Sequence, residues 1–317
     1  MTDLPPAAPL LSGVVVHWYN EELLAELAAA WPADPRFELV VVDNGSREPL
    51  KVPGARLLAP GRNLGFAGGA NAGFAAARAP LLLLLNPDAR PEPGALDELL
   101  RGFAAFPEAA GLAPRLSGPK GDPQHPWQLR DLPSPWECLR QVLLLPTLPK
   151  HRSEPIPGSP VEQPAAAALA LRREALATLS GTHGFDPLFY PAWFEDVDLA
   201  KRLQEAGQPL RYWPAAHFRH HLGSSVPRLG YDAFLYIYYR NLTRYLAKHH
   251  GTTWAWTARA LLPLGFGLRL LLLPLRRPRR AASRVEAARG LWGGIVGALS
   301  GWRWPLRLAR WTRGEPQ

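Results

Sequence analysis

Short apolar runs that end in polar residues alternate with helical patterns through the first third of the chain. β-Branched runs at 14–17 and 39–42 flank a stretch of strong helix formers at 21–30, which predicts a strand, a helix and a second strand. The five leucines of 81–85 predict a third strand, and their uninterrupted apolar character indicates burial on both faces, as in a parallel sheet. Strands alternating with helices predict an open α/β sheet, whose ligands bind beyond the carboxyl ends of its strands.

The middle of the chain has weak periodicity. Prolines number 35 and cluster at 114–164, so we expect loops there with one helix at 136–145. Regular patterns then return and predict a strand at 167–171, a helix at 173–178 and a helix at 196–206 that Gly207 ends.

The region from 231 onward is basic and rich in aromatic residues. Residues 226–317 hold sixteen Lys and Arg against three Asp and Glu, and six of the twelve tryptophans lie between 254 and 311. A helix is expected at 234–249. The apolar run 258–275 is interrupted by arginine and proline, which favours lying in or dipping into a membrane interface over crossing it. The alternatives are a basic helical pair packed on the first domain and a nucleic-acid surface; arginine beside tryptophan favours anionic lipid.

Composition narrows the class of protein. Hydrophobic residues make up 47% and charged residues 20%, as in a globular protein. The single cysteine, Cys138, excludes an internal disulfide and fits a reducing compartment. The first thirteen residues have acid and proline where a secretion signal has a basic stretch and an apolar run, so we expect a cytoplasmic location.

Polar residues follow the second and third predicted strands. Asp43 ends a buried run, where its carboxylate could accept a hydrogen bond from a pyrimidine or a ribose, although Asp-Asn-Gly-Ser is also an ordinary turn. Asp88, in Asn86-Pro87-Asp88, could bind a hard cation that bridges two phosphates of a leaving nucleotide, and this tripeptide too can be a simple turn.

Two further clusters occur later in the chain. Glu195, Asp196 and Asp198 lie on the first turn of a predicted helix after Trp193, so they either cap the helix or place a general base beside a stacking surface. His217, His220 and His221 follow some twenty residues later and are candidate metal ligands.

A glycine-rich segment, 61–73, leads into a helix and can present backbone N–H groups or approach a ligand closely. It is not a dinucleotide-binding fingerprint, and no P-loop signature occurs in the chain.

The order of these pieces resembles glycosyltransferase family 2, and within it the rhamnosyltransferase-like bacterial enzymes. The resemblance covers roughly residues 13 to 250 and rests on VVVHWYN, VVVDNGS, GRNLGFAGGANAGF, LLLLLNPDARP, GFDPLFYPAWFEDVDLAKRLQEAG and HHLGSS.

The resemblance implies a GT-A fold, with a mostly parallel central sheet flanked by helices, a nucleotide-diphospho-sugar donor, and inversion by direct displacement. Asp196 then matches the catalytic base, with Glu195 beside it. Asp88 and His220 match ligands of a divalent metal, Mg²⁺ or Mn²⁺, and Gly223 and Ser225 complete the histidine motif. The resemblance further implies a donor side of Tyr19, Asn20, Asp43, Asn63, Gly65, Asn71 and Asn86, an acceptor side of Trp193 and Asp198, and His217 or His221 as fallback metal ligands.

The chain departs from the family pattern in places. Alanines stand at 165–168 where the family has Gly-Ala, Ala70-Asn71 replaces Asn-Asn, and Asn86 replaces the first acid of a DxD-like motif. Pro191, Ala192 and Trp193 stand where the family commonly has Phe-Leu-Tyr-like residues. Neither the alanines at 165–168 nor the residues at 191–193 replace an acid, so we expect the protein to be active.

The expected protein has a GT-A domain at 10–230 and a basic helical extension at 231–317. It would act on the inner face of the cytoplasmic membrane and move L-rhamnose or another deoxyhexose from a dTDP- or UDP-sugar to a hydroxyl of a lipid-linked or cell-wall glycan, with no nucleic-acid partner. Two alternatives are a catalytically decayed sugar-nucleotide-binding scaffold and a nucleotidyltransferase. Against the second, residues 17–20 lack the basic glycine-rich signature that such enzymes carry after the first strand.

Overall fold

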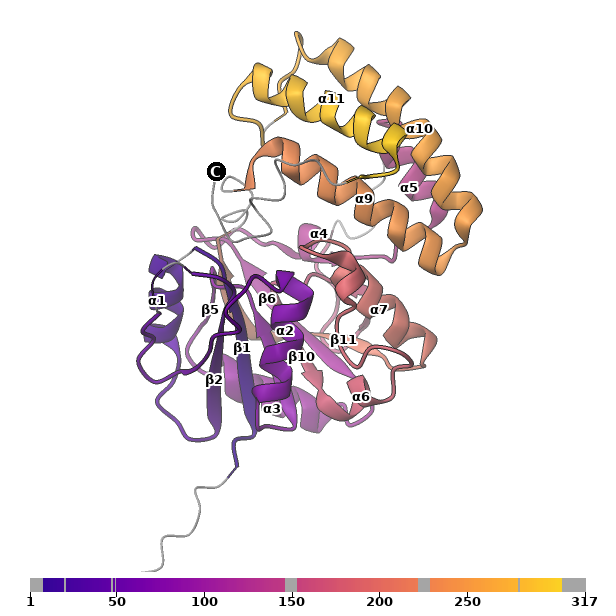
Figure 1. The fold of residues 1–317 in the computed structure, drawn as a ribbon. Helices are drawn as coiled ribbons and strands as arrows, with labels where there is room; N and C mark the ends of the chain where they lie inside the picture. The colour runs from indigo at the N-terminus through magenta and orange to yellow at the C-terminus, as the bar shows by residue number, and fades with distance from the viewer. Residues whose placement is uncertain are drawn as a thin grey trace, which may run out of the picture. The chain divides into compact units, whose positions relative to one another are not determined.

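The computed structural model describes residues 8–19, 21–46, 48, 50–145, 153–221, 229–278 and 280–303. The chain divides into two compact units, which Figure 1 colours by residue number. The first unit takes in residues 1–132, 150–186 and 196–222, and the second takes in 133–149, 187–195 and 223–317. The second unit therefore draws on two short internal segments besides the C-terminal region.

A mixed sheet forms the centre of the first unit, and its described strands follow the order β3-β2-β1-β4-β10-β6-β11-β5, with β8 beside β11. The predicted strands at 14–17, 39–42 and 81–85 are confirmed as parts of parallel neighbours. The sheet's strands are β1 Leu11–His17, β2 Phe37–Asp43, β3 Arg56–Leu58, β4 Leu81–Leu85, β5 Ala89–Pro91, β6 Gly111–Ser117, β8 Pro160–Val161, β10 Ala168–Arg172 and β11 Leu210–His220.

Helices cover both faces of this sheet, as Figure 1 shows. Along β1, Val14 and Val16 point into the core layer shared with α2 and α7, and Val15 points into the layer shared with α1 and α3. This alternation explains why the strands consist almost wholly of apolar residues. The helices of the first unit are α1 Glu21–Ala30, α2 Gly65–Ala76, α3 Ala95–Ala105, α4 His125–Gln128, α6 Arg173–Ala177 and α7 Glu195–Glu205.

The glycines of α2 let this helix pack closely on the sheet. A Cβ atom at Gly73 would lie 2.3 Å from the Val14 side chain, and one at Gly69 would lie 2.7 Å from that of Val16. Larger residues at either position would push the helix off β1. Part of the glycine-rich segment therefore serves helix–sheet contact rather than ligand contact.

Three long elements of the first unit, β6, β11 and α3, were not predicted from the sequence pattern. β6 and β11 are parallel neighbours, and α3 packs on both of them. β10 lies between β4 and β6 and runs antiparallel to each, which makes the sheet mixed rather than uniformly parallel.

The proline-rich middle of the chain contains the predicted helix as α5 Pro135–Val142. It also contains a small two-stranded sheet of β7 Leu129–Arg130 and β9 Gln163–Pro164.

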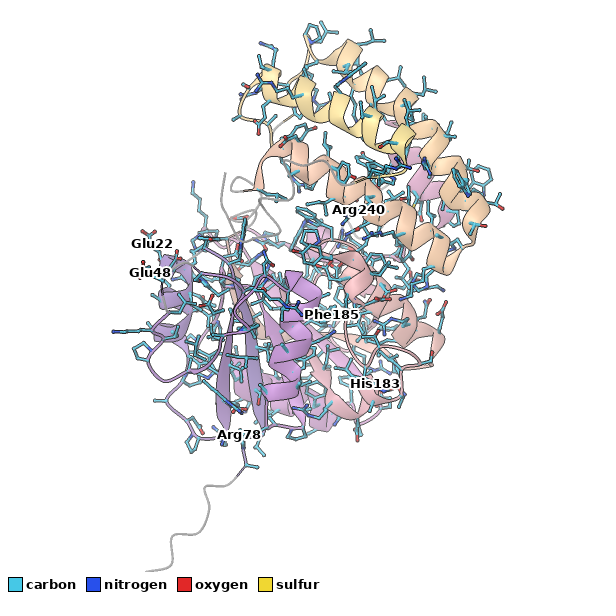
Figure 2. All side chains as sticks on the ribbon, viewed as in Figure 1. Glu22, Glu48, Arg78, His183, Phe185 and Arg240 are labelled. Carbon is cyan, nitrogen blue, oxygen red and sulfur yellow. The ribbon has the colours of Figure 1, made fainter. Side chains whose placement is uncertain are left out.

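The amino-terminal edge of the sheet is tied together by polar contacts. Ser12 Oγ donates to Glu38 Oε2 at 2.6 Å, and Arg78 donates to Glu38 through its backbone N and its Nε. Figure 2 labels Arg78 at this edge and Glu48 beyond the end of β2. Arg173 donates to the carbonyl oxygens of Phe74 and Ala77, which end α2, and to that of Ala79.

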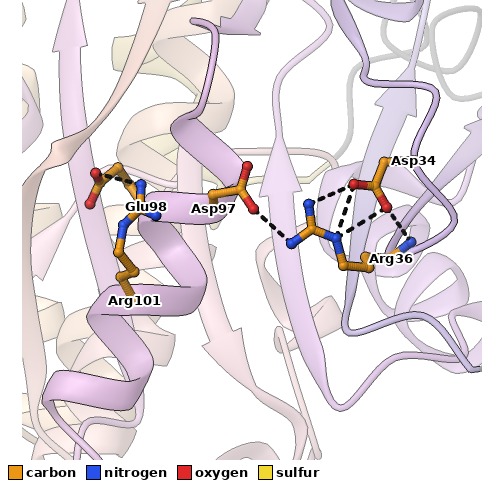
Figure 3. A network of polar contacts seen from close by, with 5 residues as sticks. All are labelled: Asp34, Arg36, Asp97, Glu98 and Arg101. Carbon is orange, nitrogen blue, oxygen red and sulfur yellow. Dashed lines mark hydrogen bonds and ion pairs between the residues drawn. The ribbon is translucent and has the colours of Figure 1, made fainter.

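A more exposed network lies at the same edge (Figure 3). The Arg36 guanidinium pairs with Asp34 at 2.6 Å and with Asp97 at 2.8 Å, so it joins the residue before β2 to the first turn of α3. Arg101 pairs with Glu98 one turn apart along α3.

The second unit is helical. Its helices are α5, the short 3-10 helix Pro187–Phe189, α9 Tyr231–His249, α10 Thr252–Leu272 and α11 Arg284–Ser300. α9, α10 and α11 each pack against the other two. Gly294 of α11 allows the Phe266 ring to approach, because a Cβ there would lie 2.6 Å from it. The predicted helix at 234–249 is confirmed as part of α9, and most of the apolar run 258–275 lies in α10, whereas α11 was not predicted.

Candidate active site

The carboxyl-terminal edge of the sheet gathers the polar motifs. His17, the last residue of β1, lies opposite Asp43, the last residue of β2, and the adjacent β4 ends at Leu85. β11 ends at the same edge with His220, because β10 runs antiparallel to β4 and β6 while β6 and β11 are parallel. The fold thus brings the ends of four strands together.

The loops after β2 and before α2 are joined by asparagine side chains. Asn44 Oδ1 accepts from Leu64 N at 2.7 Å, and Asn44 Nδ2 donates to Asn63 Oδ1 at 3.1 Å. Asn63 Oδ1 also accepts from Gly65 N at 2.8 Å. Asn63 and Gly65 therefore hold the loop in place, together with Asn44, which the sequence reasoning passed over as part of a turn.

A cavity of about 670 Å³ is lined by Tyr19 and Ser46, and Asp43 is not among its lining residues. Asp43 Oδ1 accepts from Ser46 N at 2.8 Å, and the Ser46 Oγ atom is buried without a hydrogen bond to the described residues. Tyr19 lines the cavity with a backbone φ of 52°, an uncommon conformation for a residue other than glycine. Asn20 lies outside the described residues. The remaining lining comes from α1 and the segment after Ser46: Glu21, Leu24, Ala25, Ala28, Ala29, Glu48, Leu50, Lys51, Val52 and Pro53.

Asp88 and His220 come together at the end of the sheet. Asn86-Pro87-Asp88 forms a tight turn in which Ala89 N donates to Asn86 O at 3.0 Å. The turn leads into β5, where Ala89 lies opposite His220 of β11. The Asp88 Oδ1 and His220 Nε2 atoms are 3.4 Å apart, and both side chains are buried.

Two side chains fix the imidazole of His220. Gln124 Oε1 lies 2.9 Å from His220 Nδ1, and Gln124 Nε2 donates to the His220 carbonyl at 2.9 Å. Trp127 stacks on the ring with centroids 5.3 Å apart. Because an amide oxygen can only accept, Nδ1 carries the proton and Nε2 presents a lone pair toward Asp88 in the neutral ring.

The other two histidines have different neighbours. His217 Nε2 lies 2.7 Å from Ser117 Oγ, and burial lowers the pKa of His217. His221 Nε2 lies 3.3 Å from the Arg90 guanidinium. Gly223 and Ser225 lie outside the described residues. Among the histidine, cysteine and carboxylate side chains that the structure describes, no group of three could hold a metal ion, so Asp88 and His220 form a two-residue pair.

Asp196 lies on the first turn of α7, toward the β7–β9 sheet. Its Oδ2 lies 3.3 Å from Gln163 Nε2 and 3.5 Å from the Arg130 guanidinium, and its Oδ1 accepts from Val197 N. The chain from Gln163 leads on to Ala167, whose carbonyl accepts from Asn86 N at 2.9 Å. This short segment connects the surroundings of Asp196 with the turn that carries Asp88.

Asp198 and Asn71 are engaged within the protein. Asp198 is completely buried and pairs with Arg202 at 2.8 Å, and Arg202 donates in turn to the carbonyls of Thr182 and Gly184. Asn71 bonds the backbone N and O of Phe185, a residue labelled in Figure 2. Both side chains thus hold the segment 182–185.

Trp193 and Glu195 belong to the second unit. Trp193 and Phe194 have backbone φ angles of 69° and 74°, so two successive non-glycine residues adopt a left-handed conformation that costs on the order of 1–3 kcal/mol each. Asn241 of α9 holds this segment by donating to the Trp193 carbonyl at 3.0 Å. The sequence reasoning missed Asn241, since nothing in the α9 pattern sets it apart from other helix residues.

Comparison with known proteins adds independent findings. Residues 14–159 match the model of glycosyl transferase family 2. The chain is 29% identical over 318 residues to the N-acetylglucosaminyl-diphospho-decaprenol L-rhamnosyltransferase of Mycobacterium tuberculosis (strain ATCC 25618 / H37Rv), covering 91% of this chain and 100% of that one. It is 30% identical to the pre-mycofactocin glycosyltransferase of the same strain, covering 85% of this chain and 60% of that one.

One solved structure has a similar fold. The mannosyltransferase PcManGT from Pyrobaculum calidifontis, in complex with GDP-Man and Mn²⁺, superposes with a TM-score of 0.53 at 15% identity, covering 95% of this chain and 91% of that one. The likeness confirms the predicted GT-A fold class.

Proposed function

The chain is a glycosyltransferase with a family 2 domain of the rhamnosyltransferase-like kind, and from this premise we propose that it moves a sugar, L-rhamnose or another deoxyhexose, from a nucleotide-diphospho-sugar to a lipid-linked glycan with inversion. The proposal is supported by the position of Asp43 and of the Asp88–His220 pair at the carboxyl-terminal edge of the sheet, and by the segment 163–167, which links the surroundings of Asp196 to the turn that carries Asp88. The rhamnosyltransferase relative, whose name includes a decaprenol-linked substrate, supports the choice of sugar and of acceptor class.

In the proposed reaction, Asp196 is the general base. The acceptor hydroxyl gives its proton to an Asp196 carboxylate oxygen while its oxygen forms a bond to the anomeric carbon. The bond from that carbon to the diphosphate oxygen breaks, and the nucleoside diphosphate leaves with the electron pair. Attack from the face opposite the leaving group inverts the anomeric configuration. Gln163 and Arg130 contact Asp196 Oδ2 and so orient the carboxylate.

The nucleoside end of the donor is proposed to occupy the cavity that Tyr19 and Ser46 line, next to the Asp43 carboxylate that Ser46 N contacts. Tyr19 offers a ring for stacking, and the Ser46 hydroxyl and Asp43 carboxylate offer polar contacts to a base or ribose. Asn63, Gly65 and Asn71 shape this side by holding backbone segments, and Asn86 shapes the turn before Asp88.

Asp88 and His220 fit a divalent cation. A carboxylate oxygen and an imidazole lone pair 3.4 Å apart, with the imidazole oriented from behind by Gln124, form a suitable donor set for Mn²⁺ or Mg²⁺. Magnesium sites of this type use one or two protein carboxylates plus substrate phosphates, so a two-residue pair suffices once the donor binds. The ion would neutralise the charge that develops on the diphosphate.

The acceptor side and the location follow the same proposal. Trp193 and Glu195 precede Asp196 in the chain and are proposed to contact the acceptor glycan. Asp198 is proposed to keep 182–184 in place through Arg202 instead of touching the acceptor. A lipid-linked acceptor places the enzyme at a membrane, and we propose the inner face of the cytoplasmic membrane.

The proposal is tested first by donor binding. Purified protein is titrated with dTDP-, UDP- and GDP-sugars, each with and without Mn²⁺ or Mg²⁺, and followed by thermal shift and calorimetry. Stabilisation by one nucleotide class that requires the metal supports the donor site and identifies the nucleotide. No stabilisation of the folded protein by any donor contradicts it. Binding without any turnover on a lipid-linked glycan indicates a non-catalytic sugar-nucleotide scaffold.

A further inference from the structure

The helices α10 and α11 expose apolar side chains in two continuous stripes. On α10 the outward positions are Trp256, Ala260, Leu264, Leu268 and Leu271, which recur every three to four residues and so share one helix face, and the exposed Leu275 follows in the turn after the helix. On α11, Val285, Trp292, Val296 and Leu299 recur in the same way, with Arg289 among them. The α10 stripe is about 22 Å long at 1.5 Å per residue.

The charged residues of α10 lie on its opposite face. Arg269 donates to the carbonyls of Gln141 and Val142 and to Tyr239 Oη, and Arg259 donates to the carbonyls of Ala298 and Leu299. A surface helix in water normally turns its apolar face inward and its charges outward. α10 departs from this pattern: its buried positions, such as Leu262 and Phe266, are apolar, its outer face is apolar too, and its arginines bond backbone carbonyls. This arrangement is expected of a helix whose outer face meets hydrocarbon.

The two stripes adjoin because the helices are antiparallel neighbours. At one end, the guanidinium of Arg259 lies over the Trp256 ring and also bonds the Leu299 carbonyl. At the other end, Arg284 at the start of α11 lies 3.4 Å from the Leu273 carbonyl at the end of α10. The exposed apolar residues of both helices therefore form one surface, which we call the α10–α11 face.

The positive charge near the α10–α11 face indicates which partner the face binds. Residues 252–303 contain nine arginines and a single acid, Glu286, whose carboxylate accepts from Tyr231 N and Ala282 N. Four described arginines, Arg276, Arg277, Arg280 and Arg284, are exposed where the chain passes from α10 to α11. Apolar side chains next to clustered arginine and tryptophan match the acyl chains and phosphates of an anionic bilayer.

We propose that the α10–α11 face docks in the plane of an anionic membrane, with the apolar stripes at the acyl boundary and the arginines of the connecting segment on lipid phosphates. One described helix, α10, is long and apolar enough to cross a bilayer. A crossing α10 would have to part from α9 and α11, because Leu262, Phe266 and Arg269 are engaged with the rest of the second unit. Docking in the plane keeps these contacts.

The test uses vesicles of phosphatidylcholine alone and of phosphatidylcholine with phosphatidylglycerol, in a flotation assay with the full chain. The wild type is expected to bind the mixed vesicles more tightly. Leu271→Glu/Trp292→Glu, at side chains 77% and 62% exposed, should weaken that binding about tenfold or more. Arg276→Gln/Arg277→Gln/Arg280→Gln should remove the preference for phosphatidylglycerol.

Ile156→Glu is the matched control, since Ile156 is 78% exposed but belongs to the first unit. Equal vesicle binding by the wild type and Leu271→Glu/Trp292→Glu would overturn the proposal. So would a wild-type dimer that becomes monomeric in that variant while neither binds vesicles, because the face would then join two copies of the chain.

A measurement on the wild type alone covers the case in which the variants misfold. Tryptophan quenching by lipids brominated near the headgroup should exceed quenching by lipids brominated near the chain end, and equal quenching at both depths would favour a spanning helix instead. The inference concerns the membrane step of the proposed function. Vesicle binding needs no turnover, so Asp196→Asn should bind vesicles like the wild type, and a failed donor titration would leave the membrane result unaffected.

Discussion

The two edges of the central sheet are built from the same strands but use their polar residues differently. At the amino edge, Glu38 is bonded to Ser12 and Arg78, and Arg173 donates to the backbone carbonyls of Phe74, Ala77 and Ala79. At the carboxyl edge, the Asp88 and His220 side chains lie 3.4 Å apart, and Asp43 accepts from the backbone of Ser46, which lines a cavity. Polar groups at the first edge bond other parts of the protein, whereas those at the second edge are the ones proposed above to bind the donor and a metal ion.

Because of this difference, we expect substitutions at the two edges to affect different properties of the protein. Substitutions at the amino edge should lower the free energy of unfolding with little effect on catalysis. Substitutions at the carboxyl edge should do the opposite, because the side chains there contribute few of the contacts that hold the strands together.

The largest effect is expected for Asp196→Asn. Loss of the general base should lower the transfer rate about 10²–10⁴-fold while donor affinity and melting temperature stay close to those of the wild type. Product formation under saturating donor measures the effect. Asp97→Asn, at the amino edge, is the control and should transfer at the normal rate. Wild-type turnover in Asp196→Asn would show that another group takes the proton.

A smaller effect is expected at the Asp88–His220 pair, which is proposed to bind the metal ion. His220→Ala should weaken the apparent affinity for Mn²⁺ about 10–100-fold, and Gln124→Leu should weaken it in the same direction because the imidazole loses its orientation. The readout is the Mn²⁺ dependence of donor binding by calorimetry. His217→Ala removes a histidine from the same strand that contacts Ser117 instead. If His217→Ala weakened Mn²⁺ as much as His220→Ala, the assignment of the pair would be wrong.

The smallest effect tests the amino edge. Burial raises the pKa of Glu38, but hydrogen bonds from Ser12 and Arg78 outweigh it and leave this pKa below its usual value. The carboxylate therefore adds stability above the unfolded-state pKa of about 4.3, and this stability is lost as the pH falls through the folded-state pKa. Glu38→Gln should cost about 1–3 kcal/mol at pH 7 with normal transfer.

The pH dependence sharpens that experiment. Denaturant unfolding of the wild type and Glu38→Gln is compared at pH 7 and in the acid range below about pH 4, where the gap between them should close. Asp97→Asn is again the control, since the exposed Arg36–Asp97 pair should contribute little at either pH. A gap that widened in acid would contradict the assigned direction of the Glu38 pKa.

Much of the first unit followed from the sequence because its signals are local. The apolar runs of β1, β2 and β4 identify buried strands without knowledge of their neighbours. β11 gave no such signal, because it carries Pro214 at a register shift and alternates with arginine and histidine. Its place between β6 and β5 depends on pairing with residues about 100 positions away.

The sequence indicated the acidic residues and the histidine of the candidate site, but it did not indicate the side chains that hold them in position. Asp43, Asp88, Asp196 and His220 lie in motifs that can be read from short strings. Gln124 and Gln163 come from the proline-rich middle and reach His220 and Asp196 only after folding. Their roles depend on distances between side chains, which no local pattern encodes.

The bonds from Arg173 to the end of α2 bear on the order in which the chain can fold as it is synthesised. α2 contains four glycines among its twelve residues, so it has little tendency to form a helix by itself. Arg56, which precedes α2, donates to the carbonyl of Ala76, but the guanidinium that bonds the carbonyls of Phe74 and Ala77 lies 96 to 99 residues later in the chain. We therefore expect that, in a nascent chain that has not yet released residue 173 from the ribosome, the carboxyl end of α2 lacks two of its bonds and is completed only after translation has passed the middle of the protein.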